Sequence, residues 1–172
     1  MHHADKKVFL HPGDFCFTDK TTHIHTLLGS CISITLWHPK LKIGGMCHFT
    51  LPKFPGRNTS DRKLDGRYAD DVMHMFRSET KRNGTSITEY DAKIFGGGNM
   101  MRDQGQCVDD SIGTKNAAAA MQLLMQDNIN ILVAHVGEFG HRRLVFNVET
   151  GEVWVRHTEK ESQKTGVING KV

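Results

Sequence analysis

Short stretches in which apolar and polar residues alternate, separated by turn residues, most constrain the fold of this chain. Residues 26–37 alternate in this way, and residues 42–51 give a second strand that stops at Pro52. Residues 129–136 are a nearly continuous apolar run, which is typical of a strand buried on both faces. Further strands are expected near residues 7–10, 15–17, 92–95, 144–148 and 153–156, the last two joined as a hairpin.

Two segments have helical spacing instead. In the first, Tyr68, Val72 and Phe76 recur at helical intervals and Asn83-Gly84 forms the C-cap; in the second, Ser111 is the N-cap. Strands interleaved with two helices predict an α/β or α+β domain, and the hairpins favour mixed rather than parallel sheets. The run Gly96-Gly97-Gly98 lacks the Lys-Ser/Thr of a phosphate loop, so it predicts a tight turn or a close backbone approach.

The composition is that of an ordinary globular protein. A length of 172 residues suits one domain, and a net charge of +3 gives no reason to expect a nucleic-acid partner. No apolar stretch is long enough for a membrane helix, and the first residues lack the apolar core of a secretory signal. The four cysteines have irregular spacing, which favours reduced thiols and a cytoplasmic location.

Patterned sequence ends near residue 157. Residues 158–172 are mainly polar, so we expect a domain over residues 1–157 followed by a frayed polar tail over residues 158–172. No internal repeat is visible.

The strands at 26–37 and 42–51 place Cys31 near His48. If residues 38–41 are the hairpin loop, Trp37 pairs with Lys42 and Cys31 lies directly opposite His48, with their Cβ atoms about 5 Å apart. In the same register Cys47 lies on the other, apolar face as a buried residue. The register therefore separates a candidate reactive thiol from a structural one.

A cysteine beside a histidine suits nucleophilic catalysis. The histidine forms a thiolate–imidazolium pair and later protonates a leaving amine. Backbone N–H groups around Gly29, Ser30 and Cys31 are candidates to bind an oxyanion, and Thr26 or His25 is a candidate to orient the imidazole.

Two other interpretations fit the same residues. On spacing alone, a lone cysteine before an alternating strand is more often a core residue than a nucleophile, and Cys31 fits that description. A metal site built from His23, His25, Cys31 and His48 is also conceivable, but these residues match no recognised zinc spacing. We therefore expect no metal and no cofactor.

Several blocks resemble the CheD family, and together they cover roughly residues 5–157 in family order. The blocks are residues 28–31, 44–52, 93–97, 112–116, 142–146 and 150–151, which read LGSC, GGMCHFTLP, KIFGG, IGTKN, RRLVF and TG. CheD proteins are receptor-modifying glutamine deamidases of bacterial and archaeal chemotaxis.

The resemblance implies Cys31 as nucleophile, His48 as its partner and Thr26 as the third residue. It implies a three-layer α/β sandwich similar to the catalytic domain of cytotoxic necrotizing factors. The implied substrates are glutamine side chains on the cytoplasmic region of methyl-accepting chemotaxis receptors. Some members also bind CheC, a phosphatase acting on phosphorylated CheY.

One departure stands out. Where the family usually carries two consecutive glycines, Gly137 is followed by Glu138, so the geometry of that turn is in question. Cys31, His48 and Thr26 are unaffected.

Three functions remain open at this stage. The first is a deamidase that converts Gln to Glu through a thioester. The second is a binding partner or regulator of a CheC-type phosphatase with little catalysis, and the third is a general thiol amidase or peptidase. The pairing of Cys31 with His48 favours the deamidase.

Overall fold

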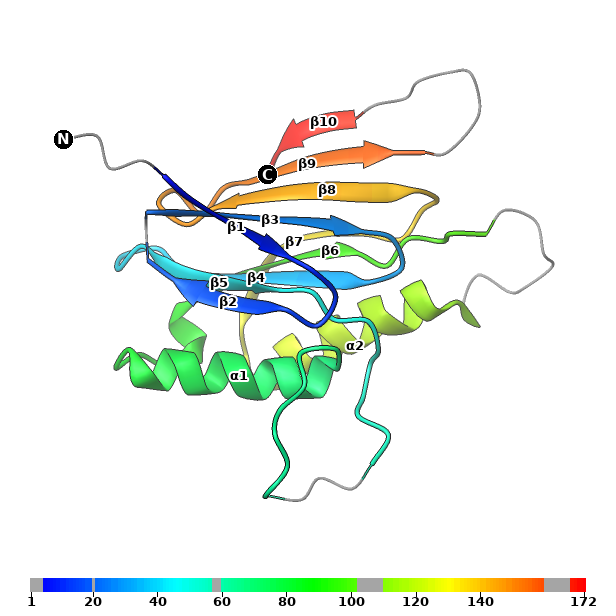
Figure 1. Cartoon of the computed structure of the whole chain (residues 1–172). Helices are drawn as coiled ribbons and strands as arrows, with labels where there is room; N and C mark the ends of the chain where they lie inside the picture. The colour runs from blue at the N-terminus through cyan, green and yellow to red at the C-terminus, as the bar shows by residue number, and fades with distance from the viewer. Residues whose placement is uncertain (1–4, 20, 57–59, 102–109, 160–167) are drawn as a thin grey trace.

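The computed structural model describes residues 5–19, 21–56, 60–101, 110–159 and 168–172. Two five-stranded sheets, an outer and an inner one, are stacked on one another. Both helices lie against the inner sheet, on the side away from the outer sheet (Figure 1). The three layers of the described chain are therefore sheet, sheet and helices. This confirms the expected α+β three-layer arrangement.

The outer sheet has the order β1-β3-β8-β9-β10. Its strands are β1 (Lys6–Leu10), β3 (Thr22–Leu28), β8 (His141–Asn147), β9 (Val153–Thr158) and β10 (Ile168–Lys171). β1 is parallel to β3, whereas the other neighbouring pairs are antiparallel. The β8–β9 hairpin confirms the one expected from the sequence.

The inner sheet has the order β2-β5-β4-β6-β7. Its strands are β2 (Phe15–Thr18), β5 (Ile43–Cys47), β4 (Ile32–His38), β6 (Asp91–Gly96) and β7 (Asn130–Val136). Only β6 and β7 among these described pairs run parallel. Each sheet is therefore mixed, as the sequence predicts.

Helices α1 (Ala69–Arg82) and α2 (Ile112–Gln126) are capped where the sequence indicates, and a short 3₁₀ helix η1 (Ile87–Glu89) precedes β6. Asn83 is the C-cap of α1, and Gly84 follows with a φ of 71°. The Ser111 side chain accepts a hydrogen bond from Thr114 N at the start of α2. In the described residues, no helix is long and apolar enough to cross a membrane.

Two cores fill the spaces between the layers. One lies between the inner sheet and the helices and includes Ile34, Cys47 and Phe76. The other lies between the two sheets and includes Ile24, Leu28 and Phe146. The inner sheet is thus buried on both faces, and the side of it that we expected to be polar is covered by the outer sheet.

The expected strand over residues 26–37 is in fact two strands that belong to different sheets. β3 ends at Leu28 in the outer sheet, and β4 begins at Ile32 in the inner sheet. Leu28 and Ile32 are four residues apart, so the alternation keeps its phase across the connection and conceals the break. Gly29, Ser30 and Cys31 form the corner between the sheets.

The apolar run at residues 129–136 is also different from expectation. It forms β7, which is an edge strand rather than one buried on both faces. Its register against β6 shifts between Ala92 and Lys93, so that Leu132 is an extra residue and is 53% exposed. A bulge of this kind interrupts pairing and turns one side chain outward.

The expected C-terminal tail contains ordered structure. Ile168–Lys171 form β10 and pair antiparallel with β9, so the end of the chain is not simply frayed. The polar composition of residues 158–172 concealed this strand, because an edge strand of a sheet with one open face buries little apolar surface.

The backbone conformation of Glu138 leads to a prediction about the stability of the protein. Glu138 has a φ of 60°, in the left-handed region, and follows Gly137 with a φ of 77°. Because a side chain in that region costs about 1 kcal/mol or more, Glu138→Gly should raise the free energy of unfolding in urea by up to about 1 kcal/mol. Glu138→Ala is the matched control and should give no increase, since it keeps the strained backbone. A Glu138→Gly variant less stable than Glu138→Ala would contradict the strain argument.

Candidate active site

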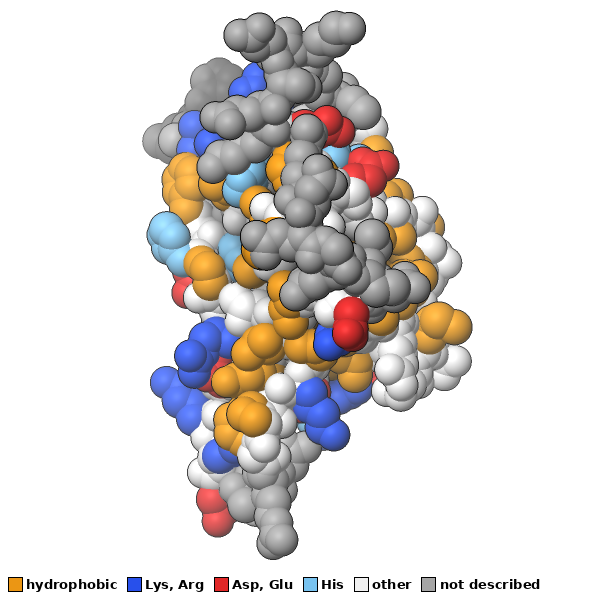
Figure 2. Space-filling view, turned by 90° about the vertical axis from the view of Figure 1, so that its right-hand side faces the viewer, with side chains coloured by type: hydrophobic (Ala, Val, Ile, Leu, Met, Phe, Trp, Pro, Cys, Tyr) orange, Lys and Arg blue, Asp and Glu red, His pale blue; other side chains and the backbone are white. Residues whose placement is uncertain are grey.

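The corner formed by Gly29, Ser30 and Cys31 lies at the right-hand end of Figure 1, which faces the viewer in Figure 2. Cys31 is partly exposed, and its side chain packs against the core between the two sheets. Figure 2 shows Lys and Arg side chains gathered on the lower part of this end, where the connection between β5 and α1 lies.

The glycine run at residues 96–98 holds this corner. Gly97 N donates to Cys31 O at 2.9 Å, and Gly98 N donates to Gly29 O at 2.9 Å. A Cβ atom on Gly96, whose φ is 110°, would overlap the Cys31 carbonyl oxygen. The expected close backbone approach is therefore confirmed, and its effect is to fix the backbone of the residue that carries the candidate nucleophile.

The β4–β5 register differs from the expected one by two residues. Trp37 pairs with Gly44 rather than Lys42, and the loop contains Lys42 with a φ of 55°. Continued to the bridge between Ile32 and Phe49, this register makes Cys31 and His48 diagonal rather than direct neighbours. Diagonal positions are about 7–8 Å apart at Cα, which is still within reach of an aromatic ring. Because the shift is an even number, every side chain keeps its predicted face.

His48 lies just after β5, where the backbone of this segment pairs with the β1–β2 turn. His48 N donates to Asp14 O at 3.1 Å, and His48 O accepts from Gly13 N at 2.8 Å. On the side facing β4, Cys47 O accepts a hydrogen bond from the Ser33 hydroxyl at 2.7 Å in place of one from a backbone N–H group. The His48 side chain is consequently directed into the space between the sheets, where it is 3% exposed.

Thr26 in β3 contacts this imidazole from the opposite sheet. Its Oγ1 lies 2.8 Å from His48 Nδ1 and donates to Leu10 O at 2.9 Å. A hydroxyl has one proton, and a carbonyl oxygen can only accept, so that proton is directed at Leu10. His48 Nδ1 must then carry a hydrogen and donate it to Thr26, which leaves Nε2 as the unprotonated nitrogen. The structure thus assigns the imidazole the tautomer of a general base.

Burial acts on both titratable groups of the pair. Burial lowers the pKa of His48 to about 4, and the neighbouring Asp14 and Leu10 carbonyl offset only part of this effect. Burial also raises the pKa of the Cys31 thiol. Both directions favour a neutral Cys31 thiol and a neutral His48 imidazole at rest, whereas the sequence led us to expect a thiolate–imidazolium pair.

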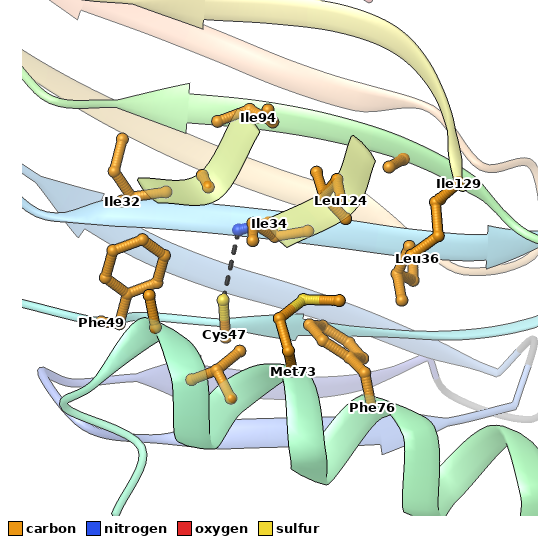
Figure 3. Packing of buried hydrophobic residues seen from close by; sticks show 14 of the residues in the cluster. Ile32, Ile34, Leu36, Cys47, Phe49, Met73, Phe76, Ile94, Leu124 and Ile129 are labelled. Carbon is orange, nitrogen blue, oxygen red and sulfur yellow. Dashed lines mark hydrogen bonds between the residues drawn. The ribbon is translucent and has the colours of Figure 1, made fainter. Parts of the chain in front are cut away.

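Cys47 lies on the other side of the inner sheet. It is fully buried among the residues between the sheet and the helices, and its Sγ accepts a hydrogen bond from Ile34 N at 3.3 Å (Figure 3). Burial raises the pKa of Cys47 to about 12. The predicted division between a structural Cys47 and a differently placed Cys31 is confirmed, even though the register that suggested it was shifted.

His25 does not reach the pair. It lies next to Thr26 on β3, so its side chain is on the outer face of the outer sheet, where its ring stacks on Phe9 with centroids 4.7 Å apart. His23 lies on the same outer face, and it cannot join His48 around one ion. In the part of the chain that the structure describes, no group of three His, Cys, Asp or Glu side chains is arranged to hold a metal.

Gly29 and Ser30, the candidate oxyanion residues, sit directly before Cys31 in the corner. Their carbonyl oxygens accept hydrogen bonds from Gly98 N and from Asn116 Nδ2, so the corner is held on its carbonyl side. A Cβ atom on Gly29 would approach Met100 Sδ to 3.0 Å, which leaves little room for a side chain there.

Two polar residues near the corner were not predicted as site residues, although both lie in blocks that resemble the CheD family, residues 112–116 and 142–146. Asn116 of α2 donates hydrogen bonds to Ser30 O, just before Cys31, and to Thr50 O, two residues after His48. Arg142 of β8 is 1% exposed and donates to Gly96 O at 3.3 Å and to Gly137 O at 2.7 Å. The available signal for Arg142 was a charged residue at an inward position of an alternating strand.

The cysteines should differ in reactivity with iodoacetamide. Cys31 should react fastest because His48 can accept its proton, whereas Cys47 is buried and should stay unmodified in the native state. Since burial raises the pKa of the Cys31 thiol, its rate should keep rising as pH increases above the ordinary range of cysteine. Peptide mapping after timed alkylation measures each rate. Cys107 lies outside the described residues.

His48→Asn is the control for that experiment. It should lower the Cys31 rate without changing that of Cys16, which is also half-buried. A Cys31 rate that is already at its plateau near pH 6 would instead indicate a thiolate–imidazolium pair. Equal alkylation rates for Cys16 and Cys31 would contradict the prediction that Cys31 is an activated thiol.

The sequence of this chain is similar to those of a known protein family. The model of the family described as CheD chemotactic sensory transduction matches residues 50–157. A "Probable chemoreceptor glutamine deamidase CheD 3" of Dechloromonas aromatica is 45% identical over 150 residues, which cover 87% of this chain and 86% of the relative. A protein named "Probable chemoreceptor glutamine deamidase CheD" from Pseudomonas savastanoi is 40% identical over 157 residues, covering 91% and 87%.

Among solved structures, the hypothetical protein YfiH of Bacillus licheniformis aligns with a TM-score of 0.44 and 16% identity, over 70% of this chain and 49% of its own. The sequence relatives are much closer. On the family match and on relatives that share 40% or more of their residues over most of both chains, the protein belongs to the CheD family.

Proposed function

We propose that this protein deamidates glutamine side chains of chemoreceptors, with Cys31 as nucleophile and His48 as general base. The names of its relatives support the substrate, since several are chemoreceptor glutamine deamidases. The observation that carries the proposal for the residues is the bond between Thr26 Oγ1 and His48 Nδ1, which leaves Nε2 free to accept a proton.

In the first half of the reaction, the Cys31 sulfur bonds to the carboxamide carbon while its proton passes to His48 Nε2. Backbone N–H groups of the corner at Gly29 and Ser30 stabilise the oxyanion. The intermediate collapses when Nε2 returns the proton to the nitrogen, and ammonia leaves. The product of this step is a thioester between Cys31 and the substrate.

In the second half, water attacks the thioester carbon and gives its proton to Nε2. Cleavage of the carbon–sulfur bond releases glutamate, and the thiolate recovers the proton from His48. The net change is replacement of an amine by a hydroxyl group. A neutral starting pair suits this cycle, because His48 accepts and returns one proton in each half and Thr26 holds its ring throughout.

Positive charge beside the corner favours a particular kind of substrate surface. Exposed Lys53 and Lys63 lie on the connection between β5 and α1, whereas the charge of the exposed Arg67 on the same connection is paired with Asp65. Because unlike charges attract, a glutamine flanked by acidic side chains suits this end better than one flanked by basic ones.

The direct test is the mass of a chemoreceptor cytoplasmic fragment before and after incubation with the protein. Conversion of glutamine to glutamate should give the small mass increase expected for exchange of nitrogen for oxygen, and peptide mapping locates it. Cys31→Ala should abolish the change while Cys47→Ala keeps it at a modest cost in stability. No change of mass with the unmodified protein would favour the alternative, a binding partner of a CheC-type phosphatase.

Replacement of Thr26 tests the orienting role. Thr26→Val keeps the shape but removes the acceptor of His48 Nδ1–H, and an unpaired buried donor costs about 1–3 kcal/mol, or roughly tenfold to a hundredfold in rate. Thr26→Ser retains the hydroxyl and should keep most of the activity. The comparison is made on kcat for the receptor fragment. Equal rates for the Val and Ser variants would exclude Thr26 from the catalytic group.

A further inference from the structure

Asn116 is a polar residue in an otherwise apolar contact between α2 and the inner sheet. It is fully buried, and Ala120 and Leu124 on the same helix belong to the core beside it. Its Nδ2 donates to Ser30 O at 3.1 Å and to Thr50 O at 2.9 Å. Both protons of the amide group are therefore directed at backbone carbonyls of the sheet layer.

These contacts determine which way the amide points. Two carbonyl oxygens can only accept, so the atom between them must be the nitrogen. The Oδ1 atom on the other side is buried, and no donor among the described residues reaches it. An unsatisfied buried acceptor costs free energy, so packing alone would favour an apolar side chain at this position.

The two carbonyls belong to the segments that carry the proposed catalytic pair. Ser30 directly precedes Cys31, and Thr50 follows His48 by two residues. In the described backbone pairing, the bridge between Ile32 and Phe49 is the only one that joins the start of β4 to the segment after β5. Asn116 thus adds a further link between the two segments at the end of the ladder, beyond that bridge and the side-chain hydrogen bonds of Ser33 and Ile34 with Cys47.

We propose that Asn116 is a positioning residue that sets the distance between Cys31 and His48 by holding both backbone segments. This rests on the proposed function of the pair. Asn116 contacts neither side chain of the pair in these hydrogen bonds and acts through the backbone. Without it, the corner and the segment after β5 can move apart, and proton transfer from the thiol to Nε2 becomes slower.

The test uses the alkylation rate of Cys31 in the full chain, with Cys16 of the same molecule as reference. Asn116→Asp keeps the shape and removes both donors, and Asn116→Ala does so without adding a charge in case the Asp variant fails to fold. Either variant should lower the Cys31 rate at pH 7.5 by about tenfold and leave Cys16 unchanged. Val72→Ala, a fully buried change on α1 in the same core, controls for a general loss of stability.

A double-mutant cycle separates positioning from stability. If Asn116 acts through the pair, its effect on the Cys31 rate should largely vanish in a His48→Asn background, whereas Val72→Ala should combine additively with His48→Asn. A rate for Cys31 that is unchanged in a folded Asn116 variant, or an effect that adds fully to that of His48→Asn, would overturn the proposal. The assay needs no receptor, so its result is independent of whether the receptor fragment is a substrate.

Discussion

The hydrogen bond between Thr26 and His48 is the interaction on which the proposed chemistry depends, because it joins the two sheets. Thr26 belongs to the outer sheet, and His48 follows a strand of the inner one. The bond forms only when the apolar residues between the sheets bring the layers together. The tautomer of the imidazole is therefore a consequence of tertiary packing.

The faces of the strands were predictable from the sequence, whereas their partners were not. Alternation fixed Cys31 and Cys47 to opposite sides, and a register error of two residues left that assignment intact because the side-chain period of a strand is also two. The same periodicity hid the corner at Gly29, since the phase continues from Leu28 to Ile32 across two sheets. Only contacts with a second sheet distinguish one long strand from two.

The residues that support the corner were beyond the reach of local pattern. Asn116 contacts Ser30 across 86 positions of sequence, and Arg142 approaches the corner from β8; for the glycine run, the close backbone approach was predicted but its partner was not. Spacing rules act within one helix or one hairpin, so they indicated Cys31 and His48 and left Thr26 and His25 as alternatives, but they indicated none of the side chains that brace the corner. Likewise His25 and Thr26 were equivalent as neighbours in sequence, and only the stacking of the sheets decided between them.

The placement of two cysteines on opposite faces of one sheet has a further consequence for the redox chemistry of the chain. A disulfide requires Cβ atoms about 4 Å apart and directed towards each other, which a backbone layer between Cys31 and Cys47 prevents. Cys47 therefore cannot serve as a resolving thiol for Cys31. A sulfenic acid formed on Cys31 by an oxidant that reaches the corner must therefore be repaired by a thiol other than that of Cys47.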